Sequence, residues 1–175
     1  MFYDLLKTRR SIRKFQDREV AAETTDTILK SALLAPSSRA RRPWEFVAVT
    51  DRDLLKKLSG CREHGSDFLA AAPLGIVVMA DPEACDVWVE DCSIAAIIIQ
   101  LAAQASGLSS CWIQVRERFH SGDVKAEDYI KSVLGIPSMY RVECMVALGY
   151  AAEAKKAYND DELMYEKIHR NRFNG

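Results

Sequence analysis

The chain has 175 residues, which suits one domain and falls short of two comfortable ones. Its content of 49% hydrophobic and 28% charged residues is typical of a soluble globular protein with a real core. The net charge of −1 argues against a general nucleic-acid or membrane-surface binder, because such proteins usually carry a basic excess. We therefore expect neither nucleic acid nor membrane as a partner.

The N-terminal third is predicted to hold two helices, a stiff loop and a strand. Apolar residues recur at helical spacing over residues 2–8 and 22–34. Residues 36–43, PSSRARRP, have a proline at each end and are rich in turn formers and cations, which predicts a stiff connecting loop. The alternating, β-rich residues 44–50 then predict a strand that leaves this loop directly.

A capped helix and a buried strand are expected next. We expect Thr50 and Asp53 to mark the start of a helix that runs through Leu58. Residues 74–80, LGIVVMA, form a continuous apolar run. Such a run predicts a strand that is buried on both faces.

The most apolar segment is a predicted helix from about Val87 to Ser106, with Gly107 as its stop. Polar residues interrupt it, and it falls below the roughly 20 apolar residues that a membrane span requires. We therefore expect a buried helix. Because one small domain supplies few layers to cover a helix that is apolar on nearly all sides, the segment favours a homodimer.

The C-terminal third is predicted to contain two strands, a helix and a polar tail. Residues 109–115 and 141–150 predict strands, and residues 126–134 predict a helix that ends at Gly135. Residues 151–175 are polar and cannot form a core alone, so they either fray or wrap onto a partner subunit. The mixed order of elements predicts a layered α+β or α/β domain.

Cysteine and histidine usage does not indicate a metal or a disulfide framework. The chain contains five cysteines, Cys61, Cys85, Cys92, Cys111 and Cys144. Their number is odd and no two have Cys-x-x-Cys spacing, so we expect reduced thiols and no metal. The N-terminal stretch is amphipathic and too short for a signal peptide, and we expect a cytoplasmic protein.

Three short motifs offer ligand chemistry, and each has a simpler alternative on its own. The run Arg9-Arg10-Ser11-Ile12-Arg13 supplies the fixed charge and hydroxyl that a phosphate ester needs, or is a set of solvated cations at a helix end. The loop 36–43 can place serine hydroxyls against a planar ligand, or merely joins a helix to a strand. The segment 107–114, GLSSCWIQ, lets backbone approach a ligand, or is an ordinary turn.

Taken together and in this order, the motifs resemble the nitroreductase family of flavin-dependent oxidoreductases. The matching segments are RRSIRKF, APSSRARRPWEF, GLSSCWI, a late ALGY and a closing His-x-x-Arg from His169 to Arg172. The resemblance runs nearly end to end. It implies an α+β fold, a nitroreductase-like layered sheet flanked by helices, in an intertwined homodimer. Residues 1–175 then form a single domain whose tail, 151–175, wraps the partner subunit.

The resemblance also implies FMN as cofactor, NADH or NADPH as electron donor, and a site built by both subunits. The implied cofactor-binding residues are Arg9, Arg10, Ser11, Arg13, Pro36, Ser37, Ser38, Gln114, Arg170 and Arg172. Residues 9–11 are implied to hold the phosphate and ribityl chain, Arg13 to reach the pyrimidine edge, and the Gln114 backbone to donate to the redox-active nitrogen. Residues 36–38 are implied to lie along the ring from the partner, and the two late arginines to help bind phosphate.

Two positions depart from the family pattern. Ala40 stands where the family has Asn, and Arg42 stands where it has Gln. With Arg39 and Arg41, Arg42 would favour an anionic acceptor or the extra phosphate of NADPH, or the three are simply solvated.

These features predict an oxidoreductase that accepts hydride from NAD(P)H and reduces a nitroaromatic, quinone or similar small-molecule acceptor by a ping-pong mechanism. No side chain has to act as a catalytic acid or base, because the flavin carries the chemistry. Trp88, Phe119 or Tyr140 could line the substrate slot. The alternatives are a flavoprotein of the same fold with other redox chemistry, such as dehalogenation or flavin breakdown, and a non-enzymatic anion-binding module.

Overall fold

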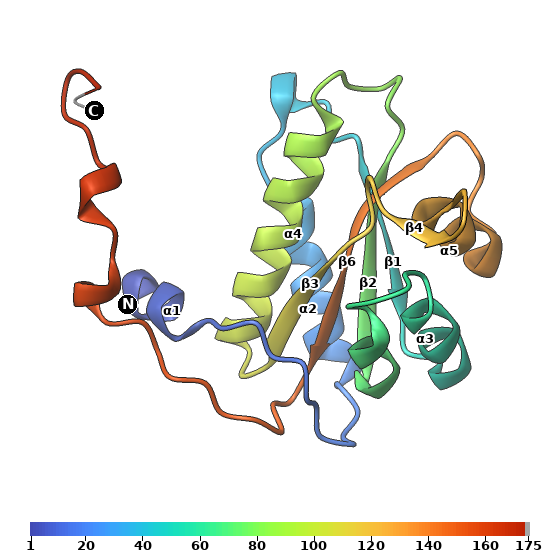
Figure 1. Ribbon diagram of the computed structural model, residues 1–175, viewed down its shortest axis with the longest axis horizontal. Coiled ribbons are helices and arrows are strands. Elements are labelled where there is room, and N and C mark those ends of the chain that lie inside the picture. The colour runs from blue at the N-terminus through green and yellow to red at the C-terminus, as the bar shows by residue number, and fades with distance from the viewer. Residues whose placement is uncertain (174–175) are drawn as a thin grey trace.

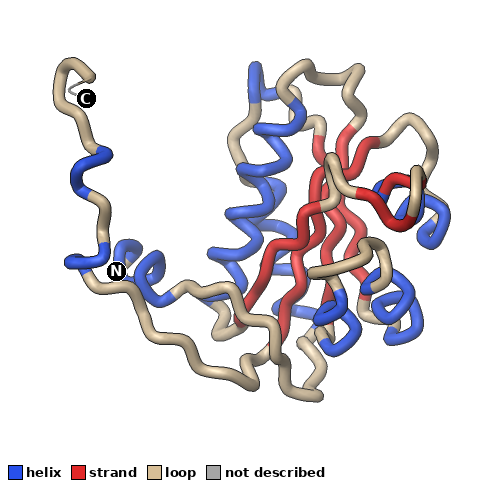
Figure 2. The backbone as a smooth tube through the Cα atoms, viewed as in Figure 1, coloured by secondary structure: helices blue, strands red, loops and turns tan. Residues whose placement is uncertain are grey.

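The computed structural model describes residues 1–173, and its centre is a four-stranded antiparallel sheet in the order β1-β2-β6-β3. The strands are β1 (Trp44–Val49), β2 (Leu74–Ala80), β3 (Ser109–Gln114) and β6 (Arg141–Gly149). Helices cover both faces of the sheet (Figure 1, Figure 2). The predicted α+β class is confirmed, and β3 forms one edge of the sheet because it pairs only with β6.

Each face of the sheet packs against its own pair of helices. α2 (Ala22–Leu33) and α4 (Trp88–Ala105) cover one face, and α3 (Arg52–Ser59) and α5 (Ala126–Leu134) cover the other. Side chains along β2 alternate between the two cores, since successive residues of a strand point to opposite faces. Every residue of β2 is buried, as its continuous apolar sequence predicts.

The start of α3 differs from the prediction. The N-cap is Asp51, whose side chain accepts the backbone N–H of Leu54 at 2.8 Å. Asp51 has the extended backbone that an N-cap requires, whereas Asp53 already lies in the first turn of the helix. The expectation that Thr50 and Asp53 mark this start is therefore wrong.

A small hairpin, β4 (Phe119–Ser121) and β5 (Val124–Lys125), has no visible signal in the sequence. Its strands are three and two residues long, too short for an alternating pattern to emerge. Gly122 supplies a left-handed φ of 52° in the connecting turn. The hairpin leads into α5, which ends at Gly135 as predicted, with φ at 67°.

Helix α4 is buried against the sheet and α2 but keeps one uncovered face. Ile94 and Ile97 lie on that face and are 37% and 39% exposed. By length and composition alone, α4 could also cross a membrane. The core helix of a soluble protein can have the same length and composition, so these two properties are weak evidence for a membrane span. The exposed isoleucines are the part of α4 that the single chain leaves uncovered.

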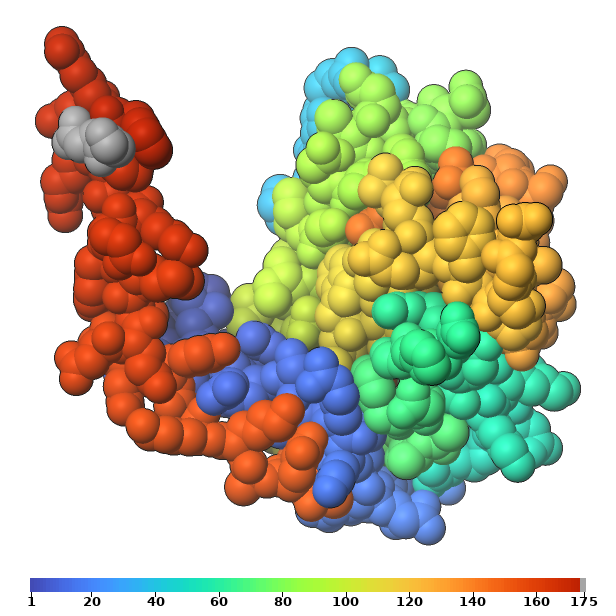
Figure 3. Space-filling view, in the orientation of Figure 1, coloured from blue at the N-terminus to red at the C-terminus, as the bar shows by residue number. Residues whose placement is uncertain are grey.

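The C-terminal tail runs away from the body of the molecule, as the ribbon and the space-filling view show (Figure 1, Figure 3). It contacts α1 (Phe2–Thr8), where the Tyr158 N–H donates to the Lys7 carbonyl at 3.0 Å and Lys7 pairs with Asp160. Beyond α1, as far as residue 173, its regular structure consists of short turns of 3-10 helix. Its exposed apolar side chains are Tyr158, Leu163, Met164, Tyr165, Ile168 and Phe173.

Candidate functional site

The free edge of β3 carries backbone groups that face away from the sheet. The Ser110 carbonyl accepts the N–H of Ile12 at 3.1 Å, and the Gln114 carbonyl accepts Arg62 Nη1 at 3.1 Å. In an antiparallel pair, the N–H and C=O of one residue point to the same side. The N–H of Gln114 therefore also points out of this edge, where it can donate to a ligand.

The predicted N-terminal run lies along the same edge. Ser11 forms a parallel bridge with Ser110, and Phe15 forms an antiparallel bridge with Ala151. Ile12 and Phe15 are buried in the core, which anchors the run and leaves Arg13 exposed between them. The charged segment is held against the sheet because its two apolar side chains are buried while the cations between them stay exposed.

Several cations gather around the start of β3. Burial raises the pKa of the Cys111 thiol, while Arg13, Lys155 and Arg9 act in the opposite direction through their charge. Lys155 also donates from Nζ to the Ser11 carbonyl at 2.6 Å. Lys155 has no distinctive signal in the sequence, because it is one lysine within a charged tail. The edge thus has the positive charge that a phosphate ester requires.

Arg10 and Arg13 of the run have different surroundings. Arg10 donates to the Lys156 carbonyl and stacks over the Tyr158 ring at 4.4 Å, so the tail holds its guanidinium. The guanidinium of Arg13 lies 5.7 Å from the centre of the Phe68 ring. Its backbone N–H donates to Glu153 at 2.6 Å, a contact that lowers the pKa of this carboxyl. The run is therefore fixed by its backbone, and the Arg13 side chain extends toward the segment that follows α3.

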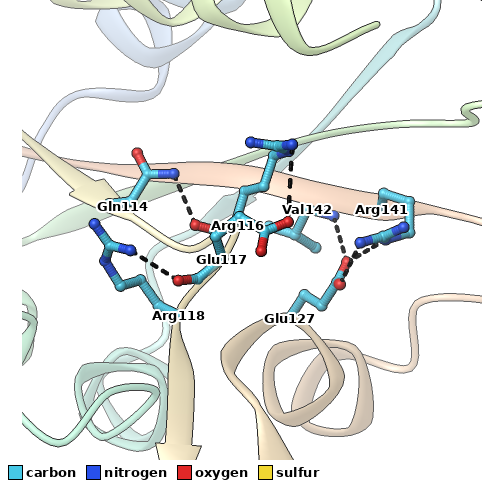
Figure 4. Close-up of polar contacts among 7 residues, drawn as sticks. All are labelled: Gln114, Arg116, Glu117, Arg118, Glu127, Arg141 and Val142. Atoms are coloured by element: carbon cyan, nitrogen blue, oxygen red, sulfur yellow. Dashed lines mark hydrogen bonds and ion pairs between the residues drawn. The ribbon is translucent and has the colours of Figure 1, made fainter. Parts of the chain in front are cut away.

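That segment supplies Arg62, which the sequence gives no reason to single out. Gln114 turns its own side chain aside and accepts Trp112 Nε1 at 3.0 Å. It also donates to the Arg116 carbonyl at 2.9 Å, the contact drawn in Figure 4. Its backbone therefore remains at the edge, between the N-terminal run and Arg62. The space-filling view shows the run and the segment after α3 side by side next to β3 (Figure 3).

The predicted Pro-Ser-Ser loop is tightly built but lies elsewhere in the chain. The Ser38 N–H donates to the buried carboxylate of Asp91 at 2.9 Å, and the Arg42 N–H donates to Ser37 Oγ at 2.9 Å. Three residues of the loop that are not glycine have a φ between 50° and 53°: Arg39, Ala40 and Arg42. These contacts hold a backbone conformation that L residues rarely adopt.

The cations of this loop are only partly available to a ligand. Arg39 forms an ion pair with Asp86, and Arg41 donates to the Ala84 carbonyl at 2.8 Å. The Arg42 side chain has no polar partner among residues 1–173. Of the three, Arg42 is therefore free to meet an anion.

The implied site residues do not all meet within one chain. Ser38 bonds to the first turns of α4, whereas Ser11 lies beside the strand that follows its last turn. The 18 residues of α4 separate these ends by about 27 Å. Arg170 and Arg172 belong to the tail, a segment that runs away from the sheet (Figure 1). One chain thus brings residues 9–13 to Gln114 and leaves the other predicted residues apart from them.

The suggested lining residues of the substrate slot have separate environments. Trp88 is 9% exposed and belongs to the core between α4 and the sheet. The Tyr140 hydroxyl donates to Glu45 at 2.8 Å, and Phe119 is exposed on β4. The expectation that Trp88 lines a slot does not agree with its burial, because a core side chain is covered by its own neighbours.

The described part of the chain contains no group of three or more His, Cys, Asp or Glu residues placed to hold a metal ion. All five cysteines are free and buried. The chemistry of the edge of β3 is that of cations and backbone donors, which suits an organic anion.

Comparison with known proteins identifies the family. The model of the nitroreductase family matches residues 6–61 and 60–150, and the chain belongs to this family. The structure of an FMN-dependent nitroreductase from Clostridium difficile R20291 superposes with a TM-score of 0.96 at 54% identity, covering 98% of this chain and 99% of that one. A protein of Archaeoglobus fulgidus, provisionally named NADH dehydrogenase/NAD(P)H nitroreductase, is 40% identical over 174 residues, 97% of each chain.

A partial similarity points to a second chemistry within the fold. Iodotyrosine deiodinase 1 of Rattus norvegicus is 44% identical over 57 residues, which make up 33% of this chain and 20% of that protein. The match covers a minority of both chains, so it does not by itself assign deiodinase activity to this protein.

Proposed function

We propose that this protein is an FMN-dependent oxidoreductase that uses NADH or NADPH to reduce a small organic acceptor such as a nitroaromatic or a quinone. The observation that supports this proposal most directly is at the edge of β3, where the outward N–H of Gln114 lies between the N-terminal run and Arg62. The FMN dependence of the Clostridium nitroreductase, at 54% identity, supports the cofactor. The NAD(P)H-linked name of the Archaeoglobus relative supports the donor.

The residues at this edge divide by the part of FMN that they suit. Arg9, Ser11 and Lys155 supply charge and a hydroxyl at the start of β3, which suits the phosphate and ribityl chain. Gln114 offers a backbone N–H that can donate to a ring nitrogen, and Arg13 offers a cation for the pyrimidine edge. FMN, when bound, would supply the hydride and electron chemistry, and these residues would position its ring and exclude water.

The site also needs a second subunit. The exposed face of α4 at Ile94 and Ile97 and the projecting apolar tail are surfaces that a partner would cover. A partner would also bring the loop at Ser38 and the late arginines to the edge of β3, which one chain cannot do. We therefore propose an intertwined homodimer of single-domain chains in which residues 151–175 wrap the partner. The free, buried cysteines suit a reducing compartment, which favours the cytoplasm.

Two substrates that share one flavin face bind in turn, and this geometry gives ping-pong kinetics. Arg42 is the free cation of the Pro-Ser-Ser loop and would favour an acceptor or donor with an anionic group. A second candidate activity is reductive dehalogenation, which the partial match to iodotyrosine deiodinase 1 favours. The two activities differ only in the acceptor.

Flavin reconstitution followed by stopped-flow spectroscopy tests the proposal. Purified protein is titrated with FMN, then mixed with NADH or NADPH to follow loss of flavin absorbance. Reduced protein is next mixed with a nitroaromatic, a quinone, free flavin and iodotyrosine in parallel. Fast reoxidation by the first two supports the proposal, and selective reoxidation by iodotyrosine supports dehalogenation. A colourless protein that cannot be reconstituted with FMN points instead to a non-enzymatic anion-binding module.

A further inference from the structure

Among residues 1–173, the Arg62 side chain forms one hydrogen bond, and this bond holds it at the free edge of β3. It follows the C-terminal end of α3 and is half-buried, and its Nη1 donates to the Gln114 carbonyl at 3.1 Å. The carbonyl and the N–H of Gln114 point out of the same edge. The guanidinium therefore lies beside the backbone donor that the proposed function assigns to the flavin ring.

The charge of Arg62 is not neutralised by the protein. Within residues 1–173, no carboxylate lies within 4.0 Å of its guanidinium, whereas Arg141 is paired with Glu127 and Arg52 with Asp17. A guanidinium has five N–H donors, and the Gln114 carbonyl takes only one of them. A half-buried cation without a counter-ion has lost part of its hydration, and an anionic ligand would compensate for this loss.

A second guanidinium, that of Arg13, also has no ion-pair partner among residues 1–173 and comes from the N-terminal run. Arg13 lies 5.7 Å from the ring of Phe68, which belongs to the segment that also carries Arg62. The two cations thus come from two different segments, the N-terminal run beside β3 and the segment after α3. An anionic ligand seated on this edge would be attracted by both charges.

We propose that Arg62 faces the flavin ring and stabilises the negative charge that the ring gains on reduction. This inference rests on the proposed function. A cation beside the ring binds the reduced cofactor more strongly than the oxidised one, and so it raises the reduction potential. A cation at the phosphate, such as Arg9, binds both forms equally because the phosphate charge does not change.

The test compares Arg62→Gln, Arg62→Lys and the wild type as FMN-loaded protein. The affinity for oxidised FMN is measured by fluorescence titration, and the two-electron potential by equilibration with a reference dye during reductive titration. We expect Arg62→Gln to lower the ratio of affinities for reduced over oxidised FMN about tenfold, which is a fall of about 30 mV. Arg62→Lys keeps the charge and should recover part of this loss.

Arg52→Gln is the matched control, because Arg52 is an exposed arginine of α3 that pairs with Asp17. Its potential should equal that of the wild type. Circular dichroism and thermal unfolding verify that each variant is folded. An unchanged potential in a folded, FMN-binding Arg62→Gln protein overturns the inference while leaving the proposed function intact. A wild-type protein that does not bind FMN overturns the proposed function, and the inference falls with it.

Discussion

Ser38 donates its backbone N–H to the carboxylate of Asp91 at 2.9 Å, which ties the Pro-Ser-Ser loop to the first turns of α4. Asp91 is only 3% exposed and also accepts the Cys85 thiol at 3.4 Å. A buried carboxylate in this position fixes a loop whose backbone is otherwise strained at three residues. The order of the loop thus depends on a residue more than fifty positions further along the chain.

Replacing Asp91 by alanine should therefore destabilise the protein and weaken flavin binding. The Ser38 N–H loses its acceptor, which costs about 1–3 kcal/mol of unfolding free energy for a buried group. Urea denaturation measures this loss, and FMN titration measures the effect on the site. Asp86→Ala is the control, because Asp86 forms an exposed ion pair with Arg39 and should cost less than about 1 kcal/mol. Equal stability of the two variants would contradict the role given to Asp91.

Arg9 is expected to contribute affinity without changing the potential. Arg9→Ala removes one charge-assisted contact to the phosphate, worth roughly 1.5–3 kcal/mol, which corresponds to about 10- to 100-fold in the dissociation constant of FMN. Fluorescence titration of the apoprotein measures this constant. Arg52→Ala should bind FMN like the wild type, since Arg52 forms an exposed ion pair with Asp17. An unaltered affinity in Arg9→Ala would mean that the phosphate is held elsewhere.

The sequence predicts the elements of this fold well where the signal is local. The apolar run of β2, the long helix α4 and the stop at Gly135 each follow from residues that are neighbours in the chain. The hairpin β4–β5 is invisible because its strands are too short to show a period. The cap of α3 is misplaced by a residue or two because several polar residues adjoin that helix start.

The candidate site is harder to predict, because the sheet alone determines that two of its proposed residues lie there. Arg62 reaches the site only because β3 is an edge strand, and that depends on its pairing with β6. Lys155 reaches it because the chain after β6 runs back beside Ser11. Residues 9–13 are predicted from the sequence because they form a recognisable motif. Which other cations lie near residues 9–13 depends on the strand order of the sheet and not on the local sequence.

The tail beyond α1 is expected to strengthen the proposed dimer. A chain shortened to end at Glu162 keeps the contacts of Lys155, Tyr158 and Asp160 with the N-terminal segment. It loses the exposed apolar side chains from Leu163 onward, which have no core to pack against in one chain. Sedimentation velocity should show that this chain dissociates at higher concentrations than the full protein, by about tenfold or more, because burying even one large apolar side chain contributes roughly 1.5–3 kcal/mol. If the shortened chain and the full protein had the same dimer dissociation constant, the tail would not contribute to the interface.

Glu143 lies on β6 with one carboxylate oxygen that has no hydrogen-bond partner in the described structure, and the residue is 4% exposed. Burial raises the pKa of this carboxyl, and Glu90 adds to the shift, while Arg116 and Ser93 oppose it. A raised pKa means that the folded state binds the proton more tightly than the unfolded state does. Stability therefore falls as the pH rises from the ordinary carboxyl range through the raised pKa.

Glu143→Gln should remove this pH dependence, because an amide cannot ionise. We expect the unfolding free energy of the variant to exceed that of the wild type by about 1 kcal/mol at pH 8, where the wild-type carboxylate is charged. The difference should shrink as the pH is lowered below the ordinary carboxyl pKa. Urea denaturation at about five pH values between pH 4 and pH 8 measures how the unfolding free energy of the wild type and of the variant depends on pH. Glu63→Gln, at a side chain 83% exposed, serves as control and should follow the wild type. A Glu143→Gln protein with the wild-type slope would show that the buried carboxyl does not control stability in this range.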